Sequence, residues 1–106
     1  MLTWADLFVK IRRADIAEKG SVFIVKFKNN DNELYYVRDI EHENNKMIIH
    51  PGNECINYVK MLIKAKDIGI WGIRNYNPDV FVKFENELLP AKEIYFDDNF
   101  DIVLTV

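Results

Sequence analysis

The stretch ELLPAKEIYFDDNFDIVL, Glu87 to Leu104, resembles an earlier part of the same chain. Fifty-four positions upstream, the segment Glu33–His50 reads ELYYVRDIEHENNKMIIH. Five of the eighteen aligned positions are identical, and the alternation of apolar and polar residues agrees as well. The similarity extends to VFIVKFK (Val22–Lys28) and VFVKFE (Val80–Glu85), which precede the two stretches. We therefore expect an internal duplication in which each copy carries three β-strands separated by turns.

Two features of this pattern leave room for another interpretation. Any two three-stranded meanders share apolar alternation and turns rich in Asn and Asp, so the likeness could arise without duplication. Pro90 is also unusual inside a strand, because proline has no N–H to donate to a neighbouring strand. It indicates a sheet edge or an irregularity at that point.

A helix is predicted before each set of strands. The first is TWADLFVKIRRADIAEKG (Thr3–Gly20), in which Thr3 and Asp6 have the spacing of a capping box, with Asp in place of the usual Glu. The second is NYVKMLIKAKDIG (Asn57–Gly69), whose residues also alternate, so a strand remains open there; the duplication favours the helix. The apolar stripe of the first helix consists of Trp4, Leu7, Phe8, Ile11 and Ala14.

These elements predict an α+β fold in one domain, residues 1–106. The domain would contain two αβββ halves, 1–53 and 54–106, with antiparallel sheets that the two helices cover. Such an arrangement would bury the apolar stripes of both helices against the sheets.

The composition restricts the class of protein. With 49% apolar and 29% charged residues, the chain is typical of a globular domain rather than a disordered one. The net charge of −3 makes nucleic-acid binding unlikely, although a local basic stripe remains open. A single cysteine, Cys55, favours a reducing compartment. The N-terminus does not read as a signal peptide and no apolar run reaches membrane-spanning length, so we expect a cytoplasmic protein without a membrane segment.

The search for a chemical site finds little. His42, His50 and Cys55 match no zinc-ligand spacing. The turn DDNFD (Asp97–Asp101) begins like a calcium loop, but it lacks the glycine at the sixth position and the glutamate at the twelfth. The chain has one serine and two threonines, and no glycine-rich phosphate loop. We therefore expect no catalytic residues, no metal ion, no cofactor and no enzymatic activity.

The best candidate for a binding surface is the connection IWGIRNYNPD (Ile70–Asp79), which is longer than a compact fold needs. It contains Trp71, Arg74 and Tyr76, and these residue types are enriched in interface hot spots. The alternative is that its apolar residues close the end of the core. The leading hypothesis is a non-catalytic protein-binding module with an accessory or regulatory role, acting on a protein partner.

Two other functions remain open. A small RNA- or DNA-binding protein could stack bases on Tyr35 and Tyr36. Its basic face would be formed by Lys60, Lys64 and Lys66. An immunity- or inhibitor-type protein, which neutralises another protein by acidic complementarity, would fit the net charge. A homodimer that pairs through a sheet edge is a further hypothesis, because open edges must be covered.

The segments LTWADLFVKI (Leu2–Ile11) and NPDVFVKFENELLPAKEIYFDDNFDIVL (Asn77–Leu104) resemble small uncharacterised proteins of phages and mobile elements. Such proteins have a short helix followed by a three-stranded meander. The resemblance implies a fold more than an activity. It favours an accessory or host-interacting role over metabolism.

Overall fold

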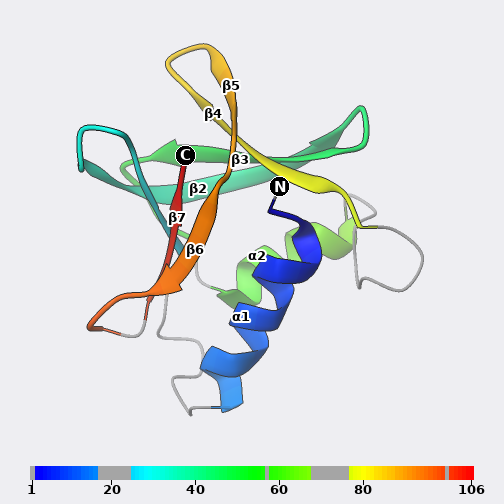
Figure 1. The fold of residues 1–106 in the computed structure, drawn as a ribbon. Helices are drawn as coiled ribbons and strands as arrows, with labels where there is room; N and C mark the ends of the chain where they lie inside the picture. The colour runs from blue at the N-terminus through cyan, green and yellow to red at the C-terminus, as the bar shows by residue number, and fades with distance from the viewer. Residues whose placement is uncertain (1, 17–24, 57, 68–76, 100) are drawn as a thin grey trace.

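The structure is a computed structural model that describes residues 2–16, 25–56, 58–67, 77–99 and 101–106. Its strands form one mixed sheet in the order β5-β4-β3-β2-β1-β7-β6. In the view of Figure 1 both helices lie below β2, β3 and β4 and to the right of the β6–β7 hairpin. In chain order the elements are α1 (Trp4–Ile16), β1 (Val25–Lys28), β2 (Leu34–Glu43), β3 (Lys46–Gly52), α2 (Tyr58–Asp67), β4 (Asp79–Phe84), β5 (Glu87–Pro90), β6 (Glu93–Phe96) and β7 (Ile102–Thr105).

The predicted pair of αβββ halves covered by two helices is wrong. β1, β2 and β3 form a meander at the centre of the sheet, but the strands of the second half separate into two hairpins. The β4–β5 hairpin lies beside β3, whereas the β6–β7 hairpin lies beside β1. The sheet is also mixed rather than antiparallel, because β3 pairs in parallel with β4 and β1 pairs in parallel with β7.

The two hairpins separate because β5 ends at Pro90 and the chain then leaves β4 to pair with another strand. Ala91 donates its N–H to the Val80 carbonyl of β4 over 3.0 Å, and Lys92 donates its N–H to the Thr105 carbonyl of β7 over 2.9 Å. Two consecutive residues therefore bond to strands near opposite ends of the strand order. This is possible only because the sheet curls into a half-barrel (Figure 1). Pro90 thus marks the irregularity that its missing N–H indicated.

Helix α1 begins as the capping pattern predicts. The backbone N–H of Thr3 donates to Asp6 Oδ2 over 2.9 Å, and the Thr3 hydroxyl lies 3.1 Å from the same oxygen. The segment before β4 also fixes this end of the helix, since Trp4 donates its N–H to the Pro78 carbonyl over 2.9 Å. Trp4, Leu7 and Ile11 of the apolar stripe are fully buried, and Phe8 packs partly buried against them.

The segment Tyr58–Asp67 is the helix α2, so the strand interpretation of this region is wrong. Met61 and Ala65 are fully buried. They lie four residues apart and therefore on one side of the helix. Neither helix in the described ranges has the length and apolar character needed to cross a membrane.

The core lies between the helices and the inner face of the curled sheet. Val25 and Phe27 of β1 are fully buried, as are Val80 and Val82 of β4. Because side chains alternate along a strand, Lys26 and Lys28 of β1 face outward. The outer face of the sheet is therefore the surface on which a binding site must be sought.

Candidate binding site on the outer face of the sheet

Most of the connection predicted to carry the binding surface, residues 70–76 of Ile70–Asp79, lies outside the described residues. Trp71, Arg74 and Tyr76 lie outside the described residues. The site described below comes instead from the first three strands, which the sequence interpretation treated mainly as scaffold.

A cavity of about 240 Å³ opens on the outer face where β1, β2 and the end of β3 meet. We call it the Tyr36 cavity. It is lined by Lys26, Leu34, Tyr35, Tyr36, Gly52 and Asn53.

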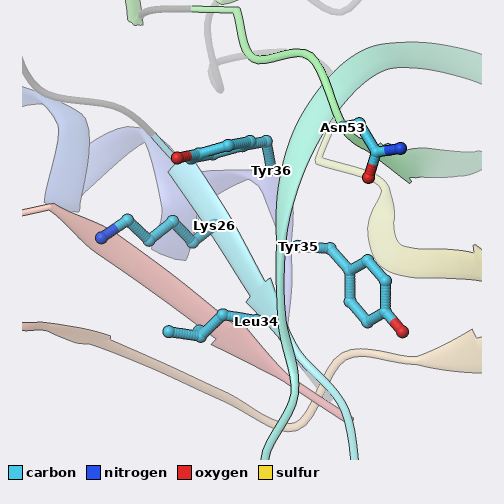
Figure 2. A pocket seen from close by; sticks show the side chains of 6 residues that line it. Lys26, Leu34, Tyr35, Tyr36 and Asn53 are labelled. Atoms are coloured by element: carbon cyan, nitrogen blue, oxygen red, sulfur yellow. The ribbon is translucent and has the colours of Figure 1, made fainter.

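Strand register places Tyr36 at the centre of this cavity. Tyr36 is paired with Lys26 of β1 on one side and with Gly52 of β3 on the other. Figure 2 shows Tyr36, Lys26 and Leu34 on the same side of β2. The side chains of Tyr36 and Leu34 are 42% and 56% exposed, although both are apolar in most of their surface. An aromatic and an aliphatic side chain are thus presented to solvent beside a hollow.

Tyr35 has a different environment, because adjacent residues of a strand face opposite sides. Its ring lies 6.1 Å from that of Phe27 and 5.0 Å from that of Phe84, and it packs against the core. Burial raises the pKa of its hydroxyl, and the charges of Glu33, Glu85 and Asp31 raise it further. The predicted two-tyrosine stacking platform is therefore not assembled on one face (Figure 2).

The three lysines of the predicted nucleic-acid face lie on α2. Lys60 and Lys66 are exposed, whereas Lys64 Nζ lies 3.7 Å from Asp39 Oδ1 of β2. Asp39 therefore partly neutralises one of the three lysines that the nucleic-acid hypothesis needs to bind phosphate groups. A basic surface with two neighbouring stacking tyrosines is not what the described residues form.

Lys26 forms one wall of the Tyr36 cavity and is held by two carboxylates. Its Nζ lies 3.0 Å from Asp97 Oδ2 and 3.2 Å from Asp101 Oδ2, which flank the turn between β6 and β7. Asp97 Oδ1 in turn accepts the backbone N–H groups of Asn99 and Asp101, each over 2.9 Å. The acidic turn that resembled a calcium loop is thus bound to a lysine ammonium. No group of three or more His, Cys, Asp or Glu side chains in the described ranges is placed to hold a metal ion.

The same contacts set the pKa values of the pair. Burial alone would lower the Lys26 pKa, but the bonds to Asp97 and Asp101 outweigh it and the pKa is raised. Burial would likewise raise the Asp97 pKa, but the ammonium of Lys26 and the N–H groups of the turn outweigh it and the pKa is lowered. The charged forms of Lys26 and Asp97 are both stabilised, so these two groups stay ionised at neutral pH.

Arg38 lies at the opposite rim, above Gly52. The register between β2 and β3 shifts between Val37 and Asp39, and Arg38 is the residue at this irregularity. A Cβ added at Gly52 would lie 2.6 Å from Arg38 Cδ, so the aliphatic part of Arg38 lies directly on the glycine. Arg38 is exposed and has no hydrogen bond or ion pair with the residues that the structure describes.

The sequence interpretation missed Leu34, Arg38 and Gly52 as site residues. Alternation along β2 was a usable signal for Leu34, because it shares a face with Tyr36. No local signal marks Arg38, since its position depends on the shift of register and on the absence of a side chain at Gly52.

A second cavity of about 220 Å³ lies on the other part of the outer face, around Ile48 and Leu88. Leu88 is 41% exposed. The remaining lining is strongly polar, and its charged members are Glu41, Glu43, Lys46 and Lys83. Both signs of charge are already present there, so this cavity offers no charge preference comparable with that at Arg38.

No protein-family model, curated protein or solved structure matches this chain. The resemblance to small phage and mobile-element proteins is therefore untested. The function proposed below rests on the geometry of the Tyr36 cavity.

Proposed function

We propose that the protein is a non-catalytic binding module with an accessory or regulatory role, and that it captures another protein through the Tyr36 cavity. The observation that carries this proposal is the exposure of Tyr36 and Leu34 beside a hollow of about 240 Å³. Small-molecule sites usually enclose roughly 300–1,000 Å³. The smaller hollow suits a single side chain inserted by a protein partner.

The chemistry of the lining also supports binding rather than catalysis. Its polar side-chain groups are the amide of Asn53, the Tyr36 hydroxyl and the Lys26 ammonium, because the Tyr35 ring points to the other side of β2. The ammonium is held by Asp97 and Asp101, so it is not a free base. A nucleophilic mechanism needs a nucleophile in hydrogen-bond reach of an oriented base, and this lining does not supply such a pair.

The nucleic-acid alternative has less support from the described residues. Tyr35 packs against the core, and Lys64 lies beside Asp39. An immunity- or inhibitor-type protein would be a special case of the proposed protein binding. A sheet-edge homodimer is less favoured. The two edge strands of the sheet are β5 and β6, and because only Ala91 and Lys92 separate them, the curled sheet brings its two edges close together. Cytoplasmic location and a phage or mobile-element origin remain part of the proposal.

The test compares two variants that each remove an exposed apolar side chain from the sheet. Tyr36→Ala alters the cavity, and Leu88→Ala is the matched control. Each is used to capture proteins from an extract of the organism that encodes the chain. The captured protein is then purified, and its Kd is measured by calorimetry. We expect Tyr36→Ala to raise Kd at least about tenfold, roughly 1.4 kcal/mol, and Leu88→Ala to leave it unchanged.

Thermal unfolding of both variants serves as the check on folding, because surface substitutions usually change stability by no more than about 0.5 kcal/mol. Equal capture by wild type and Tyr36→Ala would remove the cavity from the proposal. Retention of single-stranded oligonucleotides at low salt, with loss in Tyr36→Ala, would instead support the nucleic-acid alternative.

A further inference from the structure

The two cations at the Tyr36 cavity differ in whether their charge is neutralised. Lys26 lies between Asp97 and Asp101, so its ammonium charge is already engaged by two carboxylates. Arg38 has no ion pair with any residue in the described ranges. The cation on the β1 side of the cavity is therefore already bound by carboxylates, whereas Arg38, which lies on Gly52, is bound by no carboxylate of the described residues.

The order of these groups follows from strand register. Gly52 of β3 is paired with Tyr36, and Tyr36 is paired with Lys26 of β1. Arg38 lies on Gly52. A partner that covers the cavity therefore meets the arginine, then the tyrosine, then the Lys26 ammonium with its two bound carboxylates.

Contact with Gly52 limits the freedom of the Arg38 stem. A cation whose stem is already packed loses less conformational entropy when it binds, so it forms a better anchor than a freely moving one. Its guanidinium has a planar set of donors that matches a carboxylate with two parallel hydrogen bonds. Arginine and tyrosine side by side are also the residue types that dominate interface hot spots.

We infer that the protein partner presents an acidic side chain to Arg38, next to an apolar side chain that enters the Tyr36 cavity. This inference rests on the proposed function and adds the chemistry of the partner. A carboxylate is directed to Arg38 rather than to Lys26, because the Lys26 ammonium is already bound by Asp97 and Asp101. A basic partner residue at Arg38 would meet a cation that no residue in the described ranges neutralises.

The inference is tested with short random peptides displayed on phage, selected on the wild-type protein and counter-selected on Tyr36→Ala. We expect the selected peptides to carry Asp or Glu close to an aromatic or aliphatic residue. A synthetic peptide from this set should bind Arg38→Glu at least about tenfold more weakly than wild type. Exchanging its acidic residue for lysine should restore binding to Arg38→Glu.

Two further variants separate charge from packing. Arg38→Gln keeps much of the stem but removes the charge, so it should weaken the same peptide. Lys92→Glu is the matched charge reversal, because this exposed lysine does not line the Tyr36 cavity. It should leave the peptide affinity within about twofold of wild type. Circular dichroism confirms that each variant is folded.

The possible failures are distinguishable. Peptides that require Tyr36 but lack an acidic residue, or that bind Arg38→Glu as well as wild type, would overturn the inference about the partner and leave the proposed function standing. Selection that yields no peptide dependent on Tyr36 would overturn both.

Discussion

Replacing Lys26 with methionine removes the cation that joins β1 to the turn between β6 and β7, and it keeps most of the side-chain volume. Two bonds are lost, at 3.0 Å to Asp97 and at 3.2 Å to Asp101. A hydrogen bond to a charged group contributes roughly 1.5–3 kcal/mol, whereas an exposed ion pair contributes only about 0–1 kcal/mol. The side chains of Lys26, Asp97 and Asp101 are 14–22% exposed, so their interaction should be worth more than that of an exposed ion pair and less than that of a fully buried one. We expect a loss of about 2 kcal/mol, because the two carboxylates are also left facing each other.

This loss should depend on pH in a defined direction. The Asp97 pKa in the folded protein is lowered from 3.8, so its contribution to stability is present above that value. The contribution disappears as the pH falls through the lowered folded pKa. The Lys26 pKa is raised from 10.5, so its contribution is present below 10.5 and is lost as the pH rises through the raised value. The difference between wild type and Lys26→Met should therefore be largest near neutral pH and should shrink at both extremes.

The assay is urea denaturation of wild type and Lys26→Met at about pH 7 and at about pH 2.5. At neutral pH the variant should also melt on the order of 8 °C lower. Lys28→Met is the matched control, because it removes a lysine from the same strand. Lys28 has no ion pair with the described residues. Adding Asp97→Asn to Lys26→Met should recover part of the lost stability, since it removes one unpaired carboxylate.

The reasoning is refuted if Lys26→Met is as stable as Lys28→Met at neutral pH. A loss that persists unchanged at about pH 2.5 would also contradict it, because the Asp97 contribution decreases as the pH falls below 3.8 toward the lowered folded pKa. In that case Lys26 would contribute by packing rather than by charge.

Three further substitutions test other parts of the structure by urea denaturation. Trp4→Ala should cost about 3–5 kcal/mol, because the indole is fully buried against the core; a loss below about 1 kcal/mol would contradict its placement. Asp6→Ala should cost about 0.5–1 kcal/mol, since its carboxylate accepts the Thr3 N–H at the start of α1. Gly52→Ala should cost about 1 kcal/mol and weaken acidic peptides, because the new Cβ would lie 2.6 Å from Arg38 Cδ and displace it.

The parts of the fold that were predicted correctly depend on local patterns. The capping contact between Thr3 and Asp6 is present, and Trp4 and Leu7 of the stripe are buried. These features are set by residues three or four positions apart, so a single helical turn specifies them. The asparagine-rich turn between β2 and β3 has the same character, because Asn44 and Asn45 adopt positive φ angles.

The arrangement of the strands was not predicted because it depends on pairs distant in sequence. β1 pairs with β7, and Val25 is matched with Ile102, 77 positions later. No short motif records such a parallel pair, because parallel strands need a long connection. Alternation also gives the same signal for a continuous strand and for two strands that bend apart. Only Pro90 indicated where the second half would separate, and it did not indicate which strands the next residues would reach.

Two adjacent aromatic residues on a strand, such as Tyr35 and Tyr36, face opposite sides of the sheet. The nucleic-acid hypothesis uses Tyr35 and Tyr36 as one stacking platform, but alternation along a strand allows only one of them to face outward. The buried neighbours Val25 and Phe27 fix which one, because they place Lys26 on the outer face and Lys26 is paired with Tyr36. Tyr35 must then pack inward. A partner would therefore meet one tyrosine flanked by an arginine and by a lysine bound to two carboxylates. This combination favours an oriented protein contact over sequence-tolerant stacking of successive bases.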